Sequence, residues 1–206
     1  MAEQHDHSSR RTRAPGDRAR ARIVEQAADL ATVEGLEGLS IGRLAKVTGV
    51  AKSSVHALFG SKEELQLATI TAARDSFVTE VVAPALADTD TGRDRLAALC
   101  DGYLDYVERR VFPGGCFFVA VSAEVGARPG RVHDEVARVQ AQWRDLLVAE
   151  ARAAHERGEL QQDGDPAQLA FELGVILAGT NIVSVLHDDN GALARARTAV
   201  RDRLTG

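Results

Sequence analysis

Residues 39–65, LSIGRLAKVTGVAKSSVHALFGSKEEL, contain two short helical patterns separated by a glycine, and this stretch constrains the fold more than any other. Ser40 is a favourable helix cap, because its hydroxyl can accept a hydrogen bond from a backbone N–H. Apolar residues then follow near helical spacing at Ile41, Leu44, Ala45 and Val47. Gly49 can adopt the positive φ that ends a helix, so a first helix of about two turns is predicted, with Val50 turned inward.

The second helical pattern begins near Lys52. Val55 and Phe59 lie one turn apart and therefore share a buried face. The remaining positions form an outward face of small, polar and basic residues, which are Lys52, Ser53, Ser54, His56 and Ala57. Gly60 is expected to end this helix, and Ser61 with Glu64 to form a Ser-x-x-Glu capping box for the next one. Two short helices joined by a glycine turn indicate a helix-turn-helix unit, whose outward face suits a DNA groove.

The segment GVAKSSVHALFGSKEEL closely resembles the DNA-binding segment of the TetR family of bacterial transcriptional regulators, and the spacing from Ser40 to Leu65 matches without a gap. The outward face of the second helix then supplies the base-reading candidates, with His56 standing where the family usually has an aromatic residue. Leu58 departs from the usual His or Tyr, and either packs on the core or meets a thymine methyl group. Candidates for phosphate contacts, at helix starts or on the first helix, are Ser40, Arg43 and Lys62.

The segment before this unit is predicted to be a disordered, basic tail over residues 1–17, followed by a helix from Arg18 to Val33 that ends at Gly35. By resemblance, this helix places basic residues on DNA phosphates, and the matching positions are Arg18, Arg20 and Arg22. In the tail, Arg10, Arg11 and Arg13 are either an arm on DNA or a solvated segment. His5, Asp6 and His7 have the side chains for a metal site, but a mobile terminus is a poor place for one, and we predict no metal.

Charge is unevenly distributed along the 206 residues, whose net charge is −5. Up to Leu65 there are ten Lys or Arg against nine Asp or Glu, whereas the rest of the chain has 15 against 21. Phosphate binding depends on cations close to the DNA, because salt screens more distant charges. An acidic remainder is therefore compatible with DNA binding if it faces away from the DNA. The polar N-terminus lacks a signal-peptide core, no run approaches the roughly 18 apolar residues of a membrane span, and Cys100 and Cys116 form no disulfide framework. A cytoplasmic protein with free thiols is expected.

The chain after Leu65 shows helical periodicity and no strand alternation, so an all-α fold of about nine helices is predicted. The expected helices are 62–82 before Pro84, 93–111, 116–125, 131–158, 166–186 and 191–204. Residues 18–65 would form the helix-turn-helix domain and residues 66–206 an effector-binding and dimerisation domain. The TetR resemblance extends over residues 18–204, including GGCFFVAVSAEVGARPG and PAQLAFELGVILAGTN.

The resemblance implies an effector pocket among the fourth to eighth helices. The bulky or polar candidates there, each of which could equally be an ordinary core residue, are Phe77, Tyr103, Tyr106, Cys116, Phe117, Phe118, Trp143 and Asn181. Asn181 needs a hydrogen-bond partner if buried, from a ligand, a neighbouring helix or another subunit. The expected effector is a small apolar or aromatic molecule.

The segment FELGVILAGTNIVSVL is too apolar for a solvated helix, so helices 166–186 and 191–204 are expected to form a homodimer seam, as in the resembled family. A repressor released from operator DNA by its effector is the leading hypothesis. The alternatives are a helical-bundle enzyme and a DNA-binding protein without an effector. The sequence has no Glu-x-x-His pair, His-Glu-x-x-His, Gly-x-Ser-x-Gly or Walker-type loop, so neither catalysis nor a cofactor is expected.

Overall fold

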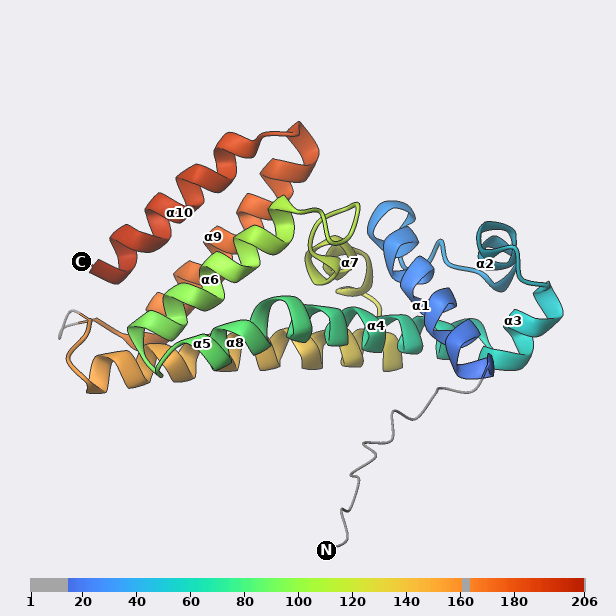
Figure 1. Ribbon diagram of the computed structural model, residues 1–206, viewed down its shortest axis with the longest axis horizontal. Helices are drawn as coiled ribbons and strands as arrows, with labels where there is room; N and C mark the ends of the chain where they lie inside the picture. Colours follow the sequence, from blue (N-terminus) through green and yellow to red (C-terminus); the bar gives the residue numbers. More distant parts are fainter. Residues whose placement is uncertain (1–14, 161–163, 206) are drawn as a thin grey trace, which may run out of the picture.

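The computed structural model describes residues 15–160 and 164–205, and every regular element in these ranges is helical (Figure 1). The elements in chain order are α1 Pro15–Glu34, α2 Ile41–Thr48, α3 Lys52–Phe59, α4 Lys62–Phe77, the π-helical turn η1 Val78–Val82, α5 Ala83–Asp88, α6 Arg93–Glu108, α7 Phe117–Val125, α8 Arg131–Glu156, α9 Pro166–His187 and α10 Asn190–Thr205. Because α4, η1 and α5 are continuous, these residues form nine helical rods. The predicted all-α fold is confirmed.

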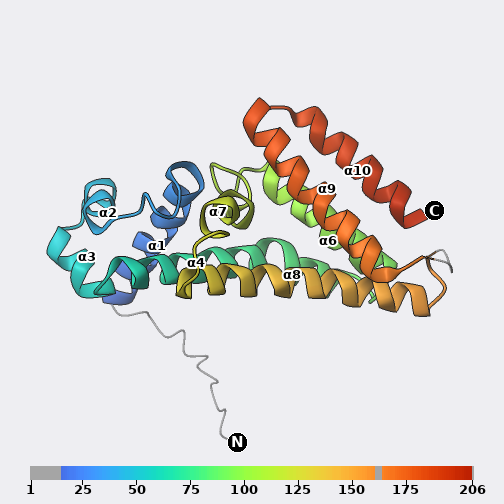
Figure 2. The same ribbon diagram turned by 180° about the vertical axis from the view of Figure 1, so that it is seen from behind.

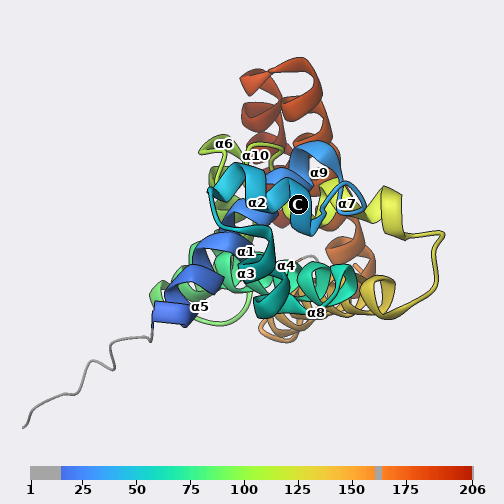
Figure 3. The same cartoon turned by 90° about the vertical axis from the view of Figure 1, so that its right-hand side faces the viewer.

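The first three helices lie at one end of the molecule, and the C-terminus of α10 lies at the other (Figure 1). Viewed from the end that carries these three helices, α1, α2 and α3 stand in front of the larger helical body (Figure 3). Helix α1 packs against α2, α4 and α7, and buries Ile23 and Ala27 together with Leu36 and Leu39 of the following loop. It begins at Pro15, before the expected start at Arg18, because proline fits the first turn of a helix.

The fourth rod does not end before Pro84 as the sequence pattern predicted. The chain passes from α4 through η1 into α5, with Pro84 in the first turn of α5. The N–H of Ala83 donates to the carbonyl of Val78, five residues back, so the backbone is wound more widely just before the proline. Such a π-turn lets a helix continue past a residue that lacks an N–H and crowds the preceding turn.

The larger body consists of α6, α8, α9 and α10 packed beside the α4–α5 rod. Helix α8 contacts α4, α6 and α9, and α10 lies on α6 and α9. Figure 2 shows α8 and α9 from the side opposite to Figure 1. Buried apolar side chains form one continuous cluster from α1 to α10, so the first three helices share a core with the rest.

Helix α9 corrects one sequence expectation, because Pro166–His187 has the length and hydropathy of a membrane span. About a third of its apolar window is buried inside the protein, since α9 packs on α6, α8 and α10. Length and composition alone therefore do not distinguish a membrane-spanning helix from a helix that packs against the rest of its own protein. Its inner face belongs to the protein core, and its outer face is an exposed apolar surface.

Candidate DNA interface and ligand pocket

The two ends of α2 are fixed by the predicted Ser40 cap and Gly49 stop, and by a hydroxyl hydrogen bond that was not predicted. The Ser40 hydroxyl accepts from the N–H of Arg43 at 3.1 Å and so caps α2. Gly49 follows α2 with φ of 68°, in the left-handed region that favours glycine. The Thr48 hydroxyl donates to the carbonyl of Leu44 at 2.7 Å, which closes the last turn of α2. Val47 departs from the expected apolar stripe, because 38% of it is exposed.

One face of α3 is buried against the core, and the opposite face is exposed. Val55 and Phe59 are buried, and the guanidinium of Arg20 lies 5.1 Å from the centre of the Phe59 ring. The five predicted base-reading residues, Lys52, Ser53, Ser54, His56 and Ala57, are all exposed. Leu58 is half-buried and packs against the core, which agrees with the first of its two expected roles. No side chain caps the N-terminus of α3, so its first backbone N–H groups are open to an anion.

Two of the predicted phosphate-binding cations have carboxylate partners within the chain. Arg43 donates to Glu34, which lowers the pKa of that carboxyl. Lys62 donates to the carbonyl and the carboxylate of Glu37 at 2.6 and 2.9 Å, and this bond lowers the pKa of Glu37. A DNA phosphate would have to displace these carboxylates. The sequence gives no sign of this, because the partners are brought close only by the fold.

Other cations near α3 have no ion pair within residues 15–160 and 164–205. Lys52 is one, and Lys46, an exposed residue on α2 that sequence reasoning missed, is another. Arg18, Arg20 and Arg22 on α1 have none either. The tail residues Arg10, Arg11, Arg13, His5, Asp6 and His7 lie outside the described residues. The unpaired basic groups of this end therefore come from α1, α2 and α3.

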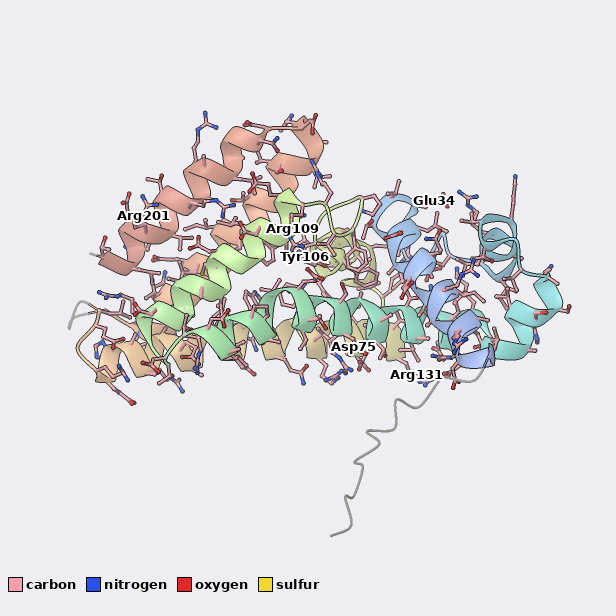
Figure 4. All side chains as sticks on the ribbon, viewed as in Figure 1. Glu34, Asp75, Tyr106, Arg109, Arg131 and Arg201 are labelled. Carbon is pink, nitrogen blue, oxygen red and sulfur yellow. The ribbon has the colours of Figure 1, made fainter. Side chains whose placement is uncertain are left out.

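Ser61 caps α4 in only half of the predicted capping box. Its hydroxyl accepts from the N–H of Glu64 at 3.1 Å, but its own N–H donates to the carbonyl of Phe59. The Glu64 carboxylate turns instead to Arg131, which also binds Glu63, at 2.7 and 2.8 Å. Figure 4 shows Arg131, the first residue of α8, close to the start of α4. The reciprocal bond of the box is thus replaced by a contact with the larger body.

A pocket of about 360 Å³ lies in the larger body among α4, η1, α6, α7, α8 and α9. It brings together five of the eight predicted effector-binding residues, which are Phe77, Tyr103, Cys116, Phe118 and Trp143. Sequence reasoning missed further apolar lining residues, including Val139, Leu146, Leu147, Phe171, Val175 and Ala178. Periodicity marks such residues as inward-facing, but it does not distinguish a cavity wall from solid core.

Aromatic rings form one side of the pocket. Phe77 meets Trp143 edge to face, with ring centres 5.1 Å apart, and meets Tyr103 similarly at 6.2 Å. Tyr103 and Trp143 are stacked at 6.2 Å. Such rings provide a large, rigid apolar surface for a ligand.

The hydroxyl of Tyr103 is the distinctive polar group of this wall. Tyr103 is 3% exposed, and its hydroxyl has no hydrogen-bond partner among the described residues. Burial, with a smaller effect of the neighbouring Cys116 thiol, raises the pKa of Tyr103 well above its usual value, so the group remains a neutral phenol. The hydroxyl is closed to solvent and lies beside the Cys116 thiol. Because buried polar groups are normally paired, a ligand that displaces the surrounding side chains would find in it an unpaired hydrogen-bonding group.

The other three predicted effector residues do not line the pocket. Tyr106 and Phe117 are buried in the core, and Figure 4 shows Tyr106 inside the body of the molecule. Asn181 accepts a hydrogen bond from the backbone N–H of Cys116 at 2.8 Å. Its partner in the structure is therefore a neighbouring segment of the same chain. Asn181 thus fixes the start of α7 behind the pocket.

Helix α7 connects the pocket to the first three helices. Cys116, Phe118 and Val119 at its beginning line the pocket. Near its end, the carboxylate of Glu124 accepts from the backbone N–H groups of Leu36 and Glu37, both at 2.7 Å. A further hydrogen bond links the segment before α7 to α1, because the N–H of Gly114 donates to the Thr32 hydroxyl at 3.0 Å. Pocket and DNA-binding unit are therefore joined by one short helix as well as by α4.

These features define a two-domain helix-turn-helix DNA-binding protein with a pocket in its larger part. Residues 23–69 match the family described as bacterial regulatory proteins, tetR family, and residues 92–200 match the tetracyclin repressor-like C-terminal domain. The chain belongs to the TetR family of transcriptional regulators.

Solved structures show the same fold. A TetR transcriptional regulator from Chloroflexus aurantiacus J-10-fl is 28% identical, with a TM-score of 0.83 over 92% of this chain and 96% of that chain. A TetR-family regulator from Cytophaga hutchinsonii is 20% identical, with a TM-score of 0.80 over 95% and 98%. AibR, solved with isovaleryl coenzyme A and operator DNA, is 21% identical, with a TM-score of 0.71 over 90% and 98%. No curated protein matches the sequence.

Proposed function

We propose that this TetR-family regulator binds operator DNA as a homodimer and is released from it by a small molecule in the pocket. One observation carries the proposal: the exposed face of α3 and the pocket lie in different parts of the molecule and are joined by α4 and α7. An effector shifts such an equilibrium only if it binds the two conformations with different affinity. That repression rather than activation is the outcome rests on the family resemblance.

In this proposal α3 enters the major groove. Lys52, Ser53, Ser54 and His56 offer hydrogen bonds to base edges, and Ala57 offers a methyl contact. Ser40, Arg43 and Lys62 contact the DNA backbone, the two cations once phosphates have replaced their carboxylate partners. The N-terminus of α3 and the unpaired Lys46 add contacts to phosphate.

The dimer places two copies of α3 on half-sites about 34 Å apart, one turn of DNA. Its seam consists of α9 and α10, which pack on each other within one chain. Large apolar side chains remain exposed on α9, with Phe171 at 62% and Leu186 at 72%. An exposed apolar face of this kind is typical of a subunit interface.

The effector is expected to have an apolar or aromatic body and one polar atom for the Tyr103 hydroxyl. The complex of AibR with isovaleryl coenzyme A and operator DNA is a precedent within the same fold for a regulator that binds both DNA and a small molecule. In this chain, a ligand that moves the start of α7 would act through Glu124 on the loop that precedes α2. Such a ligand would alter the position of the helix-turn-helix unit.

The rival hypotheses receive less support. For an enzyme, the described residues contain no group of three His, Cys, Asp or Glu side chains that could hold a metal ion, and burial raises the pKa of the Cys116 thiol in the pocket. A regulator without an effector leaves the cavity and the unpaired Tyr103 hydroxyl without a role. As a DNA-binding regulator the protein would act in the cytoplasm.

The proposal is tested with purified protein and its own promoter fragment. A gel shift that weakens steeply with salt is expected, because phosphate contacts release counterions. A panel of apolar and aromatic molecules, including short acyl thioesters, is then screened for release of the fragment and for quenching of Trp143, the only tryptophan. Wild-type protein that does not bind the fragment at low salt contradicts the DNA-binding part. A panel with no molecule that releases DNA or changes Trp143 emission contradicts the effector part.

A further inference from the structure

The pocket wall and the exposed face of α9 share residues. Phe171, Val175 and Ala178 line the pocket, and Phe171 and Val175 are also 62% and 55% exposed. One and two turns further along the same face, Ile182 and Leu186 are 54% and 72% exposed. In a single chain, one edge of the pocket is therefore an open apolar surface.

This exposed face has a symmetric arrangement about its centre. Phe171 and Val175 lie seven and three residues before Ala178, and Ile182 and Leu186 lie three and seven residues after Gly179. A two-fold contact between identical helices that run in opposite directions pairs such positions with one another. The spacing of the large residues is thus the spacing that an antiparallel crossing at Ala178 and Gly179 requires.

The glycines of α9 support a close approach by another helix. A β-carbon at Gly174 or Gly179 would meet nothing within 4 Å in this chain, so packing inside the subunit does not require glycine at either position. Glycine inside a helix costs about 0.5–1 kcal/mol relative to alanine. Close approach of a neighbouring helix backbone would explain why glycine is present at both positions.

Charge favours a copy of the same chain as the neighbour. No charged residue lies between Leu173 and Leu186. A two-fold contact brings each surface against itself, so a charge near the axis would face a like charge. The uncharged face avoids that repulsion.

We propose that a second copy of α9 crosses this one antiparallel at Ala178 and Gly179, and that the partner's Ile182 and the partner's Leu186 close the open edge of the pocket beside Val175 and Phe171. This inference rests on the dimer of the proposed function and adds that each ligand site is completed by the other subunit. Ligand binding and dimerisation are then linked, because a ligand held by both subunits stabilises the dimer.

The register is tested by disulfide trapping. A protein with Gly179→Cys should form a covalent dimer with itself on mild oxidation. Phe171→Cys and Leu186→Cys should form a covalent heterodimer when mixed, and neither should cross-link alone. Leu86→Cys is the matched control, since Leu86 is 42% exposed on α5, and it should stay monomeric on a denaturing gel. Self-cross-linking of Phe171→Cys, or no cross-link in the mixture, overturns the proposed crossing.

Closure of the pocket is tested with acrylamide as a probe of Trp143, which lines the pocket. Leu186→Asp lies about 22 Å along the helix from Phe171 and does not line the pocket, so within one chain it should leave Trp143 unchanged. We expect it to yield a folded monomer by circular dichroism and sedimentation, with a quenching constant about twofold or more above that of the wild-type dimer, because the partner no longer excludes solvent from the opening. Diluting the wild type into its monomeric range should raise the constant likewise, while Leu86→Asp changes neither property.

A folded Leu186→Asp monomer with unchanged quenching shows that one chain completes the pocket, and a variant that remains dimeric shows that this face is not the seam; either result overturns the inference. If Leu186→Asp does not fold, the dilution series alone decides. Operator binding is measured separately on the wild type. If the wild type does not bind DNA but its dimer and monomer differ in Trp143 quenching, the proposed function is refuted and the shared pocket is still supported.

Discussion

Glu124 is predicted to hold the DNA-binding unit on the larger body, and Glu124→Ala tests this directly. The carboxylate accepts two backbone N–H bonds at 2.7 Å, one partly buried at Leu36 and one exposed at Glu37. Hydrogen bonds to a charged group contribute about 1.5–3 kcal/mol each, and the exposed one falls at or below the lower end. We therefore expect Glu124→Ala to reduce the free energy of unfolding by about 2–3 kcal/mol.

The loss should be local before it is global. Hydrogen exchange at the amides of Leu36 and Glu37 should accelerate by about 30- to 150-fold, since each 1.4 kcal/mol is a factor of ten. Amides in α9 that exchange through global unfolding should accelerate by no more than this factor, and those that exchange through local opening of α9 should not change. Glu135→Ala is the control, because Glu135 bonds Arg138 within α8, a pair worth about 0.2–0.5 kcal/mol. If Glu124→Ala and Glu135→Ala show the same unfolding free energy and the same loop exchange, the reasoning fails.

Three further predictions follow from single contacts. Gly115→Ala should lower the unfolding free energy by about 2 kcal/mol or more in a urea titration, because Gly115 has φ of 79° and an added β-carbon would overlap the amide oxygen of Asn181. Stability should fall as the pH drops through the lowered pKa of Glu37, because its ionised form holds Lys62; this contribution is complete above about pH 4.3, the ordinary range of a glutamate. The thiol of Cys100 should react with a maleimide at pH 8 only as fast as the protein unfolds, because burial raises its pKa to about 12.

Each of these three predictions has a result that would contradict it. Gly42→Ala is the control for Gly115, since a β-carbon at Gly42 meets nothing within 4 Å, and an equal loss in both variants would point to a general effect of alanine. Glu37→Gln should make the acid transition shallower, and an unchanged transition would mean that Lys62 does not depend on the ionised carboxyl. Rapid labelling of Cys100 in native buffer would contradict its burial.

The sequence predicts most helix boundaries because they depend on neighbouring residues. Ser40, Gly49, Gly60 and Ser61 act through their own dihedral angles and hydroxyls, and the structure bears each out. Pro84 does not end its helix as the sequence predicts, because a π-turn a few residues earlier lets the helix continue, and that turn has no clear signature in the residues themselves.

Contacts between distant segments escape the sequence for a physical reason. Whether Arg43 and Lys62 are unpaired depends on the loop that carries Glu34 and Glu37, and the fold alone decides that. The pocket is a similar case, because Tyr103 and Tyr106 have the same periodicity in α6 while only Tyr103 reaches the cavity. The outer face of α3, in contrast, follows from helical spacing and was predicted residue by residue.

The central claim is that the outer face of α3 reads DNA, and fluorescence anisotropy of a labelled promoter fragment tests it most directly. Lys52→Ala combined with His56→Ala should weaken binding about a hundredfold or more, since contacts to bases contribute about 1–3 kcal/mol each, while sedimentation still shows the wild-type dimer. Arg152→Ala is the control, because Arg152 is exposed near the C-terminal end of α8 and belongs neither to the helix-turn-helix unit nor to the proposed seam. The account predicts wild-type affinity for Arg152→Ala and near loss of binding for the double variant. Equal affinity of the double variant and the wild type would contradict it.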